Sequence, residues 1–187
     1  MMRKEQFNVK SMVMIGMFTA VLAVLSILEI PMPSGVPITL QTFAVALCGY
    51  VLGWKRGAAC GALYLLIGTI GVPVFAGMSG GISKLLGPTG GFIFGFILLA
   101  GLCGVGAACK NKILAVVAGI LGLAACHLLG ALQFSVVTST GVVQSLLLVS
   151  VPYLVKDVLS VFGALLVGSI LRKRLMQANL INYEQIA

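Results

Sequence analysis

The fold of this chain is decided by residues 91–134, GFIFGFILLAGLCGVGAACKNKILAVVAGILGLAACHLLGALQF. This stretch holds two long apolar runs, 91–108 and 113–134, and its only Lys, Arg, Asp or Glu residues are Lys110 and Lys112 between them. About 20 consecutive apolar residues are enough for a helix to cross the hydrocarbon core of a bilayer. The stretch therefore predicts two membrane-spanning helices joined by a short basic turn.

The rest of the chain has the same character. Hydrophobic residues make up 60% of its 187 residues, charged residues make up 9%, and the mean hydropathy is +1.16. A soluble domain is nearer to about 45–50% apolar and about 25% charged. This composition excludes a soluble enzyme, a disordered tail and a disulfide-rich secreted domain. We expect an all-α integral membrane protein with a single domain.

Six apolar runs are predicted as transmembrane helices: 12–28, 39–54, 57–71, 91–108, 113–134 and 151–171. The second and third runs are short, so their bounds are the least defined. Six spans place both termini on one side of the membrane, and all but two of the 12 Lys and Arg residues fall on that side. The exceptions are Lys84 and Lys156. By the positive-inside rule, both termini are cytoplasmic, and the net charge of +8 reflects topology rather than nucleic-acid binding.

The connection between the third and fourth runs, residues 72–90, is unlike a flexible linker. With its flanking residues it contains seven glycines, interleaved with apolar side chains such as Phe75 and Met78. Flexible linkers are polar, whereas apolar side chains on a glycine-rich backbone indicate a loop that packs into the protein. A purely structural lid or re-entrant hairpin is one interpretation, and the wall of an outward-facing ligand site is the favoured one. A phosphate-binding P-loop is excluded, because Lys84 follows Ser83 rather than glycine.

The last apolar run contains an acidic residue, which is costly at membrane depth and therefore a functional candidate. Asp157 lies 15 residues before Arg172, about 22 Å along a helix, at the level of the glycine-rich loop. Tyr153 and Ser160 lie one turn away, so one helix offers a carboxylate, a phenol and a hydroxyl to a cavity. Lys156 points about 100° away around the helix, so it need not pair with Asp157. Alternatively, both charges mark the membrane boundary and extend to water.

Other polar residues in the apolar runs have weaker signals. A lone histidine in an apolar helix, His127, is more often a hydrogen-bonded core residue than a ligand contact. Gln41 can both donate and accept, so it suits an amide-like ligand, and Glu29 is most simply an interfacial cap of the first span. No catalytic motif is present, which argues against an enzyme. One histidine and five scattered cysteines predict no metal site, and no cofactor is expected.

Small residues recur on the first span at Gly16 and Ala20, a spacing that lets helices approach closely in lipid. These small residues fit either packing of helices within this chain or docking of another membrane subunit.

Three stretches carry a resemblance to a known family: VPITLQT at 36–42, GVPVFAG at 71–77 with the glycines at 80–81 and GPTGGF at 87–92, and PYLVKD at 152–157. On these residues the chain resembles the BioY family, the biotin-specific substrate-binding (S) components of energy-coupling factor transporters. The similarity is collinear over about residues 8–174, and the middle stretch is its most specific part.

The resemblance implies a six-helix protein of a bacterial or archaeal plasma membrane that binds biotin from outside, under loops. It also implies docking, through Gly16 and Ala20, on a membrane-embedded T component that two cytoplasmic ATPases drive. The family's acidic residue falls on Asp157, which would accept hydrogen bonds from the ureido N–H groups. Ser79 stands where relatives often carry Asn, and Ser160 where some carry a basic residue. These departures leave the partner of the biotin carboxylate open, with Lys84 and Lys156 as candidates by charge.

The residue chemistry also suits biotin. Its apolar rings fit against Phe75, Met78, Tyr64 and the glycines Gly80 and Gly81, and its ureido edge fits the donors and acceptors of Asp157, Gln41 and Ser79. The rival hypotheses are an S component for riboflavin or thiamine, an intramembrane enzyme that uses Asp157 and His127, and a scaffold subunit without a ligand.

Overall fold

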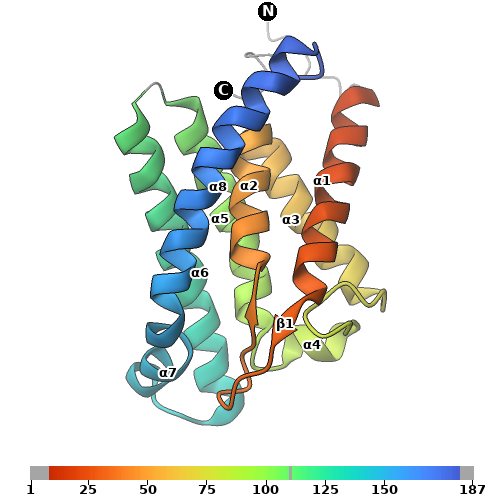
Figure 1. The fold of residues 1–187 in the computed structure, drawn as a ribbon. Helices are drawn as coiled ribbons and strands as arrows, with labels where there is room; N and C mark the ends of the chain where they lie inside the picture. Colours follow the sequence, from red (N-terminus) through yellow and green to blue (C-terminus); the bar gives the residue numbers. More distant parts are fainter. Residues whose placement is uncertain (1–8, 110, 182–187) are drawn as a thin grey trace, which may run out of the picture.

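The computed structural model describes residues 9–109 and 111–181, and its main elements are helices that run side by side (Figure 1). The longer ones are α1 (Val9–Ile27), α2 (Gln41–Leu52), α3 (Trp54–Thr69), α5 (Gly90–Ala108), α6 (Lys112–Thr138) and α8 (Val151–Gln177). Each of the six predicted apolar runs coincides with one of these helices. The short elements are the strands β1 (Glu29–Ile30) and β2 (Ile38–Thr39) and the helices α4 (Ile82–Leu86) and α7 (Val142–Val149).

The long helices begin and end where the sequence supplies caps. Asn111 accepts a hydrogen bond from the backbone N–H of Ile113 at 2.8 Å, which starts α6 directly after the basic turn. Ser139 adopts a left-handed conformation, with φ of 54°, and ends the same helix. Pro152 lies in the first turn of α8, where its missing N–H is not needed.

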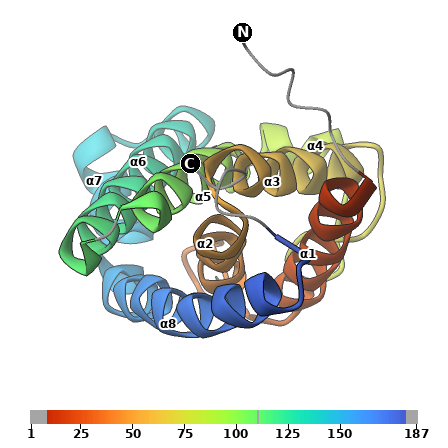
Figure 2. The same cartoon turned by 90° about the horizontal axis from the view of Figure 1, so that it is seen from above.

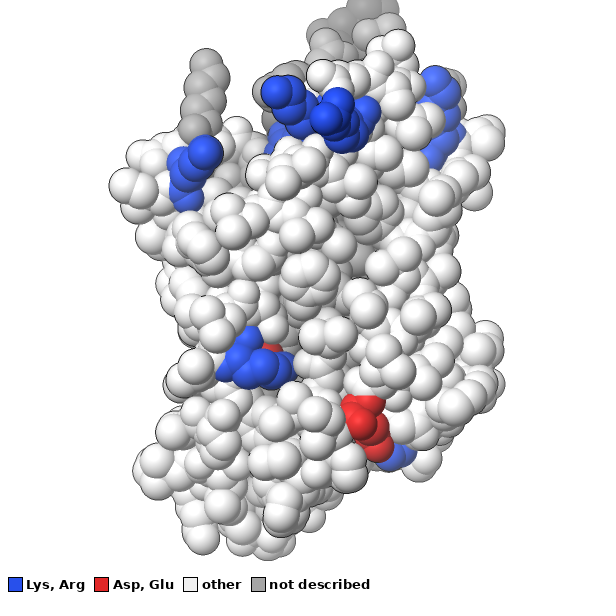
Figure 3. Space-filling model, in the orientation of Figure 1, with Lys and Arg blue, Asp and Glu red and all other residues white. Residues whose placement is uncertain are grey.

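The surface of the bundle matches a membrane environment. Among the described residues, α1, α5, α6 and α8 are long and apolar enough to cross a bilayer, whereas α2 has 12 residues and α3 has 16. Large apolar side chains face outward, as at Val155, which is 73% exposed. Figure 3 shows Lys and Arg gathered at the end where α1 begins and α8 ends, above a broad uncharged belt. The protein is therefore a multi-pass membrane protein.

The centre of the bundle is occupied by α2. Figure 2 shows this helix enclosed by α1, α3, α5, α6 and α8, and every residue from Ala44 to Leu52 is buried. Its contact with α5 depends on Gly49, since a β-carbon there would overlap the carbonyl oxygen of Ala100. Gly53, with φ of 83°, then turns the chain directly into α3.

The short elements were not predicted, and they gather at the end of the bundle opposite the basic cluster (Figure 1). The two strands pair antiparallel, with Glu29 opposite Thr39 and Ile30 opposite Ile38. The residues between the strands contain three prolines, and they form the loop that reverses the chain direction from β1 to β2. This arrangement closes the end of the bundle with β1, β2 and α4.

Candidate ligand-binding site

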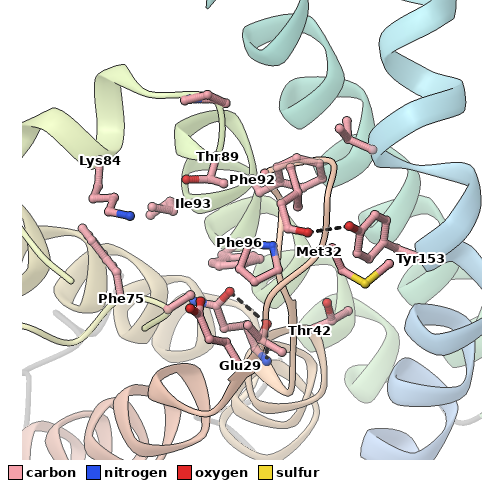
Figure 4. Close-up of a pocket in the computed structure, with 18 of the residues that line it drawn as sticks. Glu29, Met32, Thr42, Phe75, Lys84, Thr89, Phe92, Ile93, Phe96 and Tyr153 are labelled. Atoms are coloured by element: carbon pink, nitrogen blue, oxygen red, sulfur yellow. Dashed lines mark hydrogen bonds between the residues drawn. The ribbon is translucent and has the colours of Figure 1, made fainter. Parts of the chain in front are cut away.

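A cavity of about 520 Å³ lies beneath these short elements. Its floor is made by α2, α5, α6 and α8, and its roof is made by the β1–β2 loop and the segment from α3 to α5. Aromatic side chains from the roof and from α5 line much of it, among them Phe75, Phe92 and Phe96 (Figure 4). Small-molecule pockets usually have volumes of about 300–1,000 Å³ and are mostly apolar with a few convergent polar groups, as here.

The structure brings together most of the residues predicted for the site. The cavity is lined by Gln41, Phe75, Ser79, Lys84, Tyr153, Lys156 and Asp157. These residues come from four separate parts of the chain: α2, the loop after α3, α4, and the first turns of α8. The expected convergence of the glycine-rich loop and the last helix is therefore found at one end of the bundle.

Five residues predicted to contact the ligand are not among those that line the cavity: Tyr64, Met78, Gly80, Gly81 and Ser160. Met78 is 66% exposed and points away from it, with φ of 54° in the turn of the loop. A β-carbon at Gly80 would lie 2.5 Å from the carbonyl oxygen of Val72, so this glycine serves close packing within the loop. Gly81 precedes the first turn of α4, and Ser160 lies one turn beyond Asp157, below the cavity floor.

Asp157 is 4% exposed and lies between two basic side chains. Its Oδ1 atom lies 2.5 Å from Nζ of Lys156, and its Oδ2 atom lies 3.2 Å from Nε2 of His127 on α6. The flexible lysine side chain turns back toward its neighbour, which the angular separation on the helix did not predict. The hypothesis that Asp157 extends to water is wrong, because the carboxylate is buried against the cavity. His127 is buried but also lines the cavity.

Lys156 also connects the site to the roof. Its ammonium group donates a hydrogen bond to the backbone carbonyl of Thr39 in β2 at 3.0 Å, and its side chain is 29% exposed. One turn earlier on α8, the hydroxyl of Tyr153 donates to the carbonyl of Val36 and hydrogen-bonds Ser34 at 2.7 Å. Figure 4 shows this phenol meeting the loop carbonyl. The β1–β2 loop is thus fastened to α8 at two points.

The side-chain amide of Gln41 forms hydrogen bonds within the protein through both its nitrogen and its oxygen. Its Nε2 donates to the hydroxyl of Tyr64 at 2.8 Å, and its Oε1 accepts from Thr39 at 3.1 Å. The Tyr64 hydroxyl in turn donates to the carbonyl of Val74 at 3.1 Å. This chain of hydrogen bonds ties β2, α3 and the glycine-rich loop together, and Tyr64 lies behind the wall instead of facing the cavity.

The glycine-rich loop is anchored by residues that the sequence did not single out. Gln133 on α6 donates to the carbonyls of Leu85 at 2.5 Å and Gly87 at 2.8 Å, at the end of α4. Gln133 is a polar side chain in an apolar run, the same signal that drew attention to His127. Glu29, expected to cap the first span, lies two residues beyond the end of α1 in β1 and lines the cavity, and its carboxylate occupies the place that a β-carbon of Gly77 in the loop would take.

The charges of the cavity are spread over its two sides. Asp157 and Lys156 are carried by α8 and His127 by α6. Lys84 enters from α4 beside Phe75 and Ile93, across the cavity from Tyr153 of α8 (Figure 4). A carboxylate with basic neighbours suits a neutral group that carries N–H donors, and a lysine on the opposite side suits an anion. Between them lies an aromatic chamber.

Comparison with known proteins identifies the family. The model of the BioY family matches residues 1–177. The chain belongs to the BioY family. This confirms the resemblance found in the sequence.

Relatives of this BioY chain occur in bacteria and archaea. It is 43% identical over 122 residues to the biotin transporter BioY of Thermotoga maritima, which covers 65% of this chain and 72% of that protein. It is 35% identical over 133 residues to the probable biotin transporter BioY of Pyrococcus horikoshii, which covers 71% of this chain and 78% of that protein. Its fold matches a crystal structure of the S-component for biotin from an ECF-type ABC transporter with a TM-score of 0.81. That match has 26% sequence identity and covers 92% of this chain and 95% of that one.

Proposed function

We propose that this chain is the biotin-binding S component of an energy-coupling factor transporter and mediates biotin uptake. The observation that carries the proposal is the cavity at one end of the bundle, on whose wall Asp157 is buried between Lys156 and His127. Membership of the BioY family supports the ligand, and it also supports a transport protein rather than an enzyme.

The ligand lies across the cavity with its ureido group at α8. The carboxylate of Asp157 accepts a ureido N–H, because each of its oxygens keeps an acceptor position besides the one that faces a basic neighbour. The apolar rings pack against Phe75, Phe92 and Phe96. The valeryl chain then extends toward α4.

Lys84 is the better of the two candidate partners for the biotin carboxylate. Lys156 is already engaged by Asp157 at 2.5 Å and by the carbonyl of Thr39 at 3.0 Å. Lys84 is exposed, and its ammonium group enters the cavity from the side opposite Tyr153, which lies one turn before Asp157 on α8 (Figure 4). An extended ligand can therefore reach Asp157 and Lys84 with its two ends.

The chain forms one membrane domain whose six longer helices all cross a bacterial or archaeal plasma membrane. The two short ones, α2 and α3, are supported by their neighbours, and α2 is enclosed on all sides (Figure 2). The basic residues near the start of α1 and the end of α8 face the cytoplasm, by the positive-inside rule. The cavity then opens at the outer face, as uptake requires.

The energy-coupling module, a membrane T component and two cytoplasmic ATPases, docks on α1. Gly16 and Ala20 are both exposed, and nothing lies within 4 Å of where a β-carbon of Gly16 would be. Beside them runs an apolar groove of about 620 Å³ between α1 and the end of α8, which Val13, Met17 and Ala20 line on the α1 side. A partner helix packs closely on such a surface. Movement of the roof loops then releases biotin inward, and ATP hydrolysis in the partners resets the complex.

The proposal is tested by equilibrium binding of tritiated biotin to the purified chain in detergent, with riboflavin and thiamine as competitors. Saturable biotin binding that excess riboflavin and thiamine do not displace is expected. Absence of biotin binding by a folded chain, or displacement by either other vitamin, overturns the proposal. The Lys84→Ala variant is expected to bind biotin more weakly than the unchanged chain does. Biotin methyl ester, which lacks the carboxylate, is expected to bind equally to the variant and to the unchanged chain. An equal loss of affinity for both ligands contradicts the role of Lys84.

A further inference from the structure

His127 is a buried polar residue whose role the ligand contacts proposed above do not explain. It lies on α6, and its side chain is 8% exposed. Its Nε2 atom lies 3.2 Å from Oδ2 of Asp157, which is carried by a different helix, α8. The contact therefore links two helices at the point where the site holds its acidic residue.

The ring of His127 has one arrangement that fits its surroundings. Its Nδ1 atom is buried without a hydrogen-bond partner among the described residues, so the ring hydrogen is best placed on Nε2, where it faces the carboxylate of Asp157. Phe92 packs edge-on against the ring, with centroids 5.7 Å apart and planes at 90°. The Phe92 ring is itself seated on Gly130, where a β-carbon would overlap it. The imidazole is thus fixed by packing on α5 and α6.

We propose that His127 is the positioning residue for Asp157: its Nε2–H holds Oδ2 of the carboxylate from α6 and so fixes the direction in which the carboxylate accepts the ligand's N–H. The inference rests on the proposed function and deepens it. Lys156 contacts the other oxygen, Oδ1, as an ion pair at 2.5 Å, so the carboxylate is held by groups from two helices. Without His127, Oδ2 loses the group that fixes its direction from α6.

A neutral donor in this place also suits the charge of the site. Lys156 already balances Asp157, and a neutral imidazole adds a hydrogen-bond donor without a second positive charge. The carboxylate then keeps enough negative character to bind N–H groups of a neutral cyclic urea. Other groups that interact with the carboxylate are the hydroxyl of Thr42 and the thiol of Cys126, and both residues also line the cavity.

The test compares three substitutions of His127 by biotin binding to the full chain in detergent. His127→Leu, which keeps the volume but has no donor, is expected to weaken binding about tenfold or more, the effect of losing one hydrogen bond to a charged group. His127→Gln places an amide nitrogen near the position of Nε2 and is expected to stay within about threefold of the unchanged chain. His127→Asn places its amide nearer Nδ1 and is expected to bind as weakly as the Leu variant. Leu128→Ala, on the exposed neighbouring residue, is the matched control and is expected to leave binding unchanged.

A double-mutant cycle separates positioning from a merely structural role. In an Asp157→Ala background, His127→Leu is expected to cost less than about twofold in affinity, because the carboxylate through which His127 acts is gone. Additive losses, equal binding of the Gln and Asn variants, or unchanged binding of the Leu variant each overturn the inference. If the Leu variant fails to fold, the comparison of Gln with Asn still decides. Failure of the unchanged chain to bind biotin contradicts the proposed function instead.

Discussion

Replacement of Asp157 by asparagine is the most direct test of how the cavity recognises its ligand. The substitution keeps the shape of the side chain, but it removes the charge and exchanges one acceptor oxygen for an NH2 donor. Nζ of Lys156 lies 2.5 Å from Oδ1, and Nε2 of His127 lies 3.2 Å from Oδ2. If the NH2 group is turned toward Lys156, it faces another donor, and if it is turned toward His127, it does so while the ring hydrogen is on Nε2.

The size of the effect follows from these contacts. Loss of a hydrogen bond to a charged group costs roughly 1.5–3 kcal/mol, which corresponds to roughly 10- to 150-fold in dissociation constant. The donor-to-donor contact favours the upper part of that range. The folded chain also loses a buried ion pair, and we expect a cost of about 1–3 kcal/mol in stability, less than for a fully buried pair because Lys156 is 29% exposed.

The assay is equilibrium dialysis of tritiated biotin against the purified Asp157→Asn variant, with thermal unfolding of the same preparation. Ser169→Ala is the matched control on α8, since Ser169 is exposed and donates a hydrogen bond to the carbonyl of Leu166 in its own helix at 2.8 Å. The control is expected to bind as the unchanged chain does. An Asn variant that is folded and binds biotin within twofold of the unchanged chain refutes the assignment of Asp157.

Three other substitutions test the wall, the roof and the docking surface. Gly68→Ala places a β-carbon in the ring of Phe75 and pushes that ring toward the cavity, so biotin binding is expected to weaken about tenfold. Gly101→Ala is the control, because the nearest atom to its β-carbon would be 3.9 Å away, and it is expected to keep normal affinity. Tyr153→Phe removes the hydrogen bonds to the β1–β2 loop, and the dissociation rate of biotin, measured by chase with unlabelled ligand, is expected to rise about fivefold; an unchanged rate contradicts a fastening role. Gly16→Leu is expected to keep biotin affinity but to abolish copurification with the energy-coupling module, and normal copurification excludes this face as the docking surface.

The helices could be predicted from sequence because burial in lipid leaves a strong compositional signal. Each apolar run became a helix with bounds within a few residues, and the last one continues to Gln177 because basic residues extend a helix past the membrane. The short elements left no such signal. The strands have two residues each and are separated by a loop with three prolines. α7 has only eight residues, of which Ser145 and Val149 are buried.

The site could be predicted in part for a similar reason. A charge at membrane depth is expensive, so Asp157 was identifiable from its position in an apolar run. Its partners were not, because a lysine side chain can turn back toward its neighbour and because His127 comes from another helix. Gly80 and Gly81 were predicted as ligand contacts; they do not line the cavity, and a β-carbon at Gly80 would overlap the backbone of Val72. A glycine in sequence does not distinguish ligand contact from close backbone packing.

The position of Lys156 has a consequence for how the chamber opens. One ammonium group holds both the carboxylate of Asp157 and the carbonyl of Thr39 in β2. Movement of β2 away from α8 removes a hydrogen bond from Lys156, the same residue that balances the charge of Asp157 at the ligand-binding site. Closure of the loop and binding of the ligand are therefore thermodynamically linked. The factor by which the ligand favours the closed conformation equals the factor by which closure raises the affinity for the ligand. The cavity then binds its ligand tightly only in the closed conformation. A partner protein that displaces the β1–β2 loop lowers the affinity by the same movement, without a second interaction at the ligand.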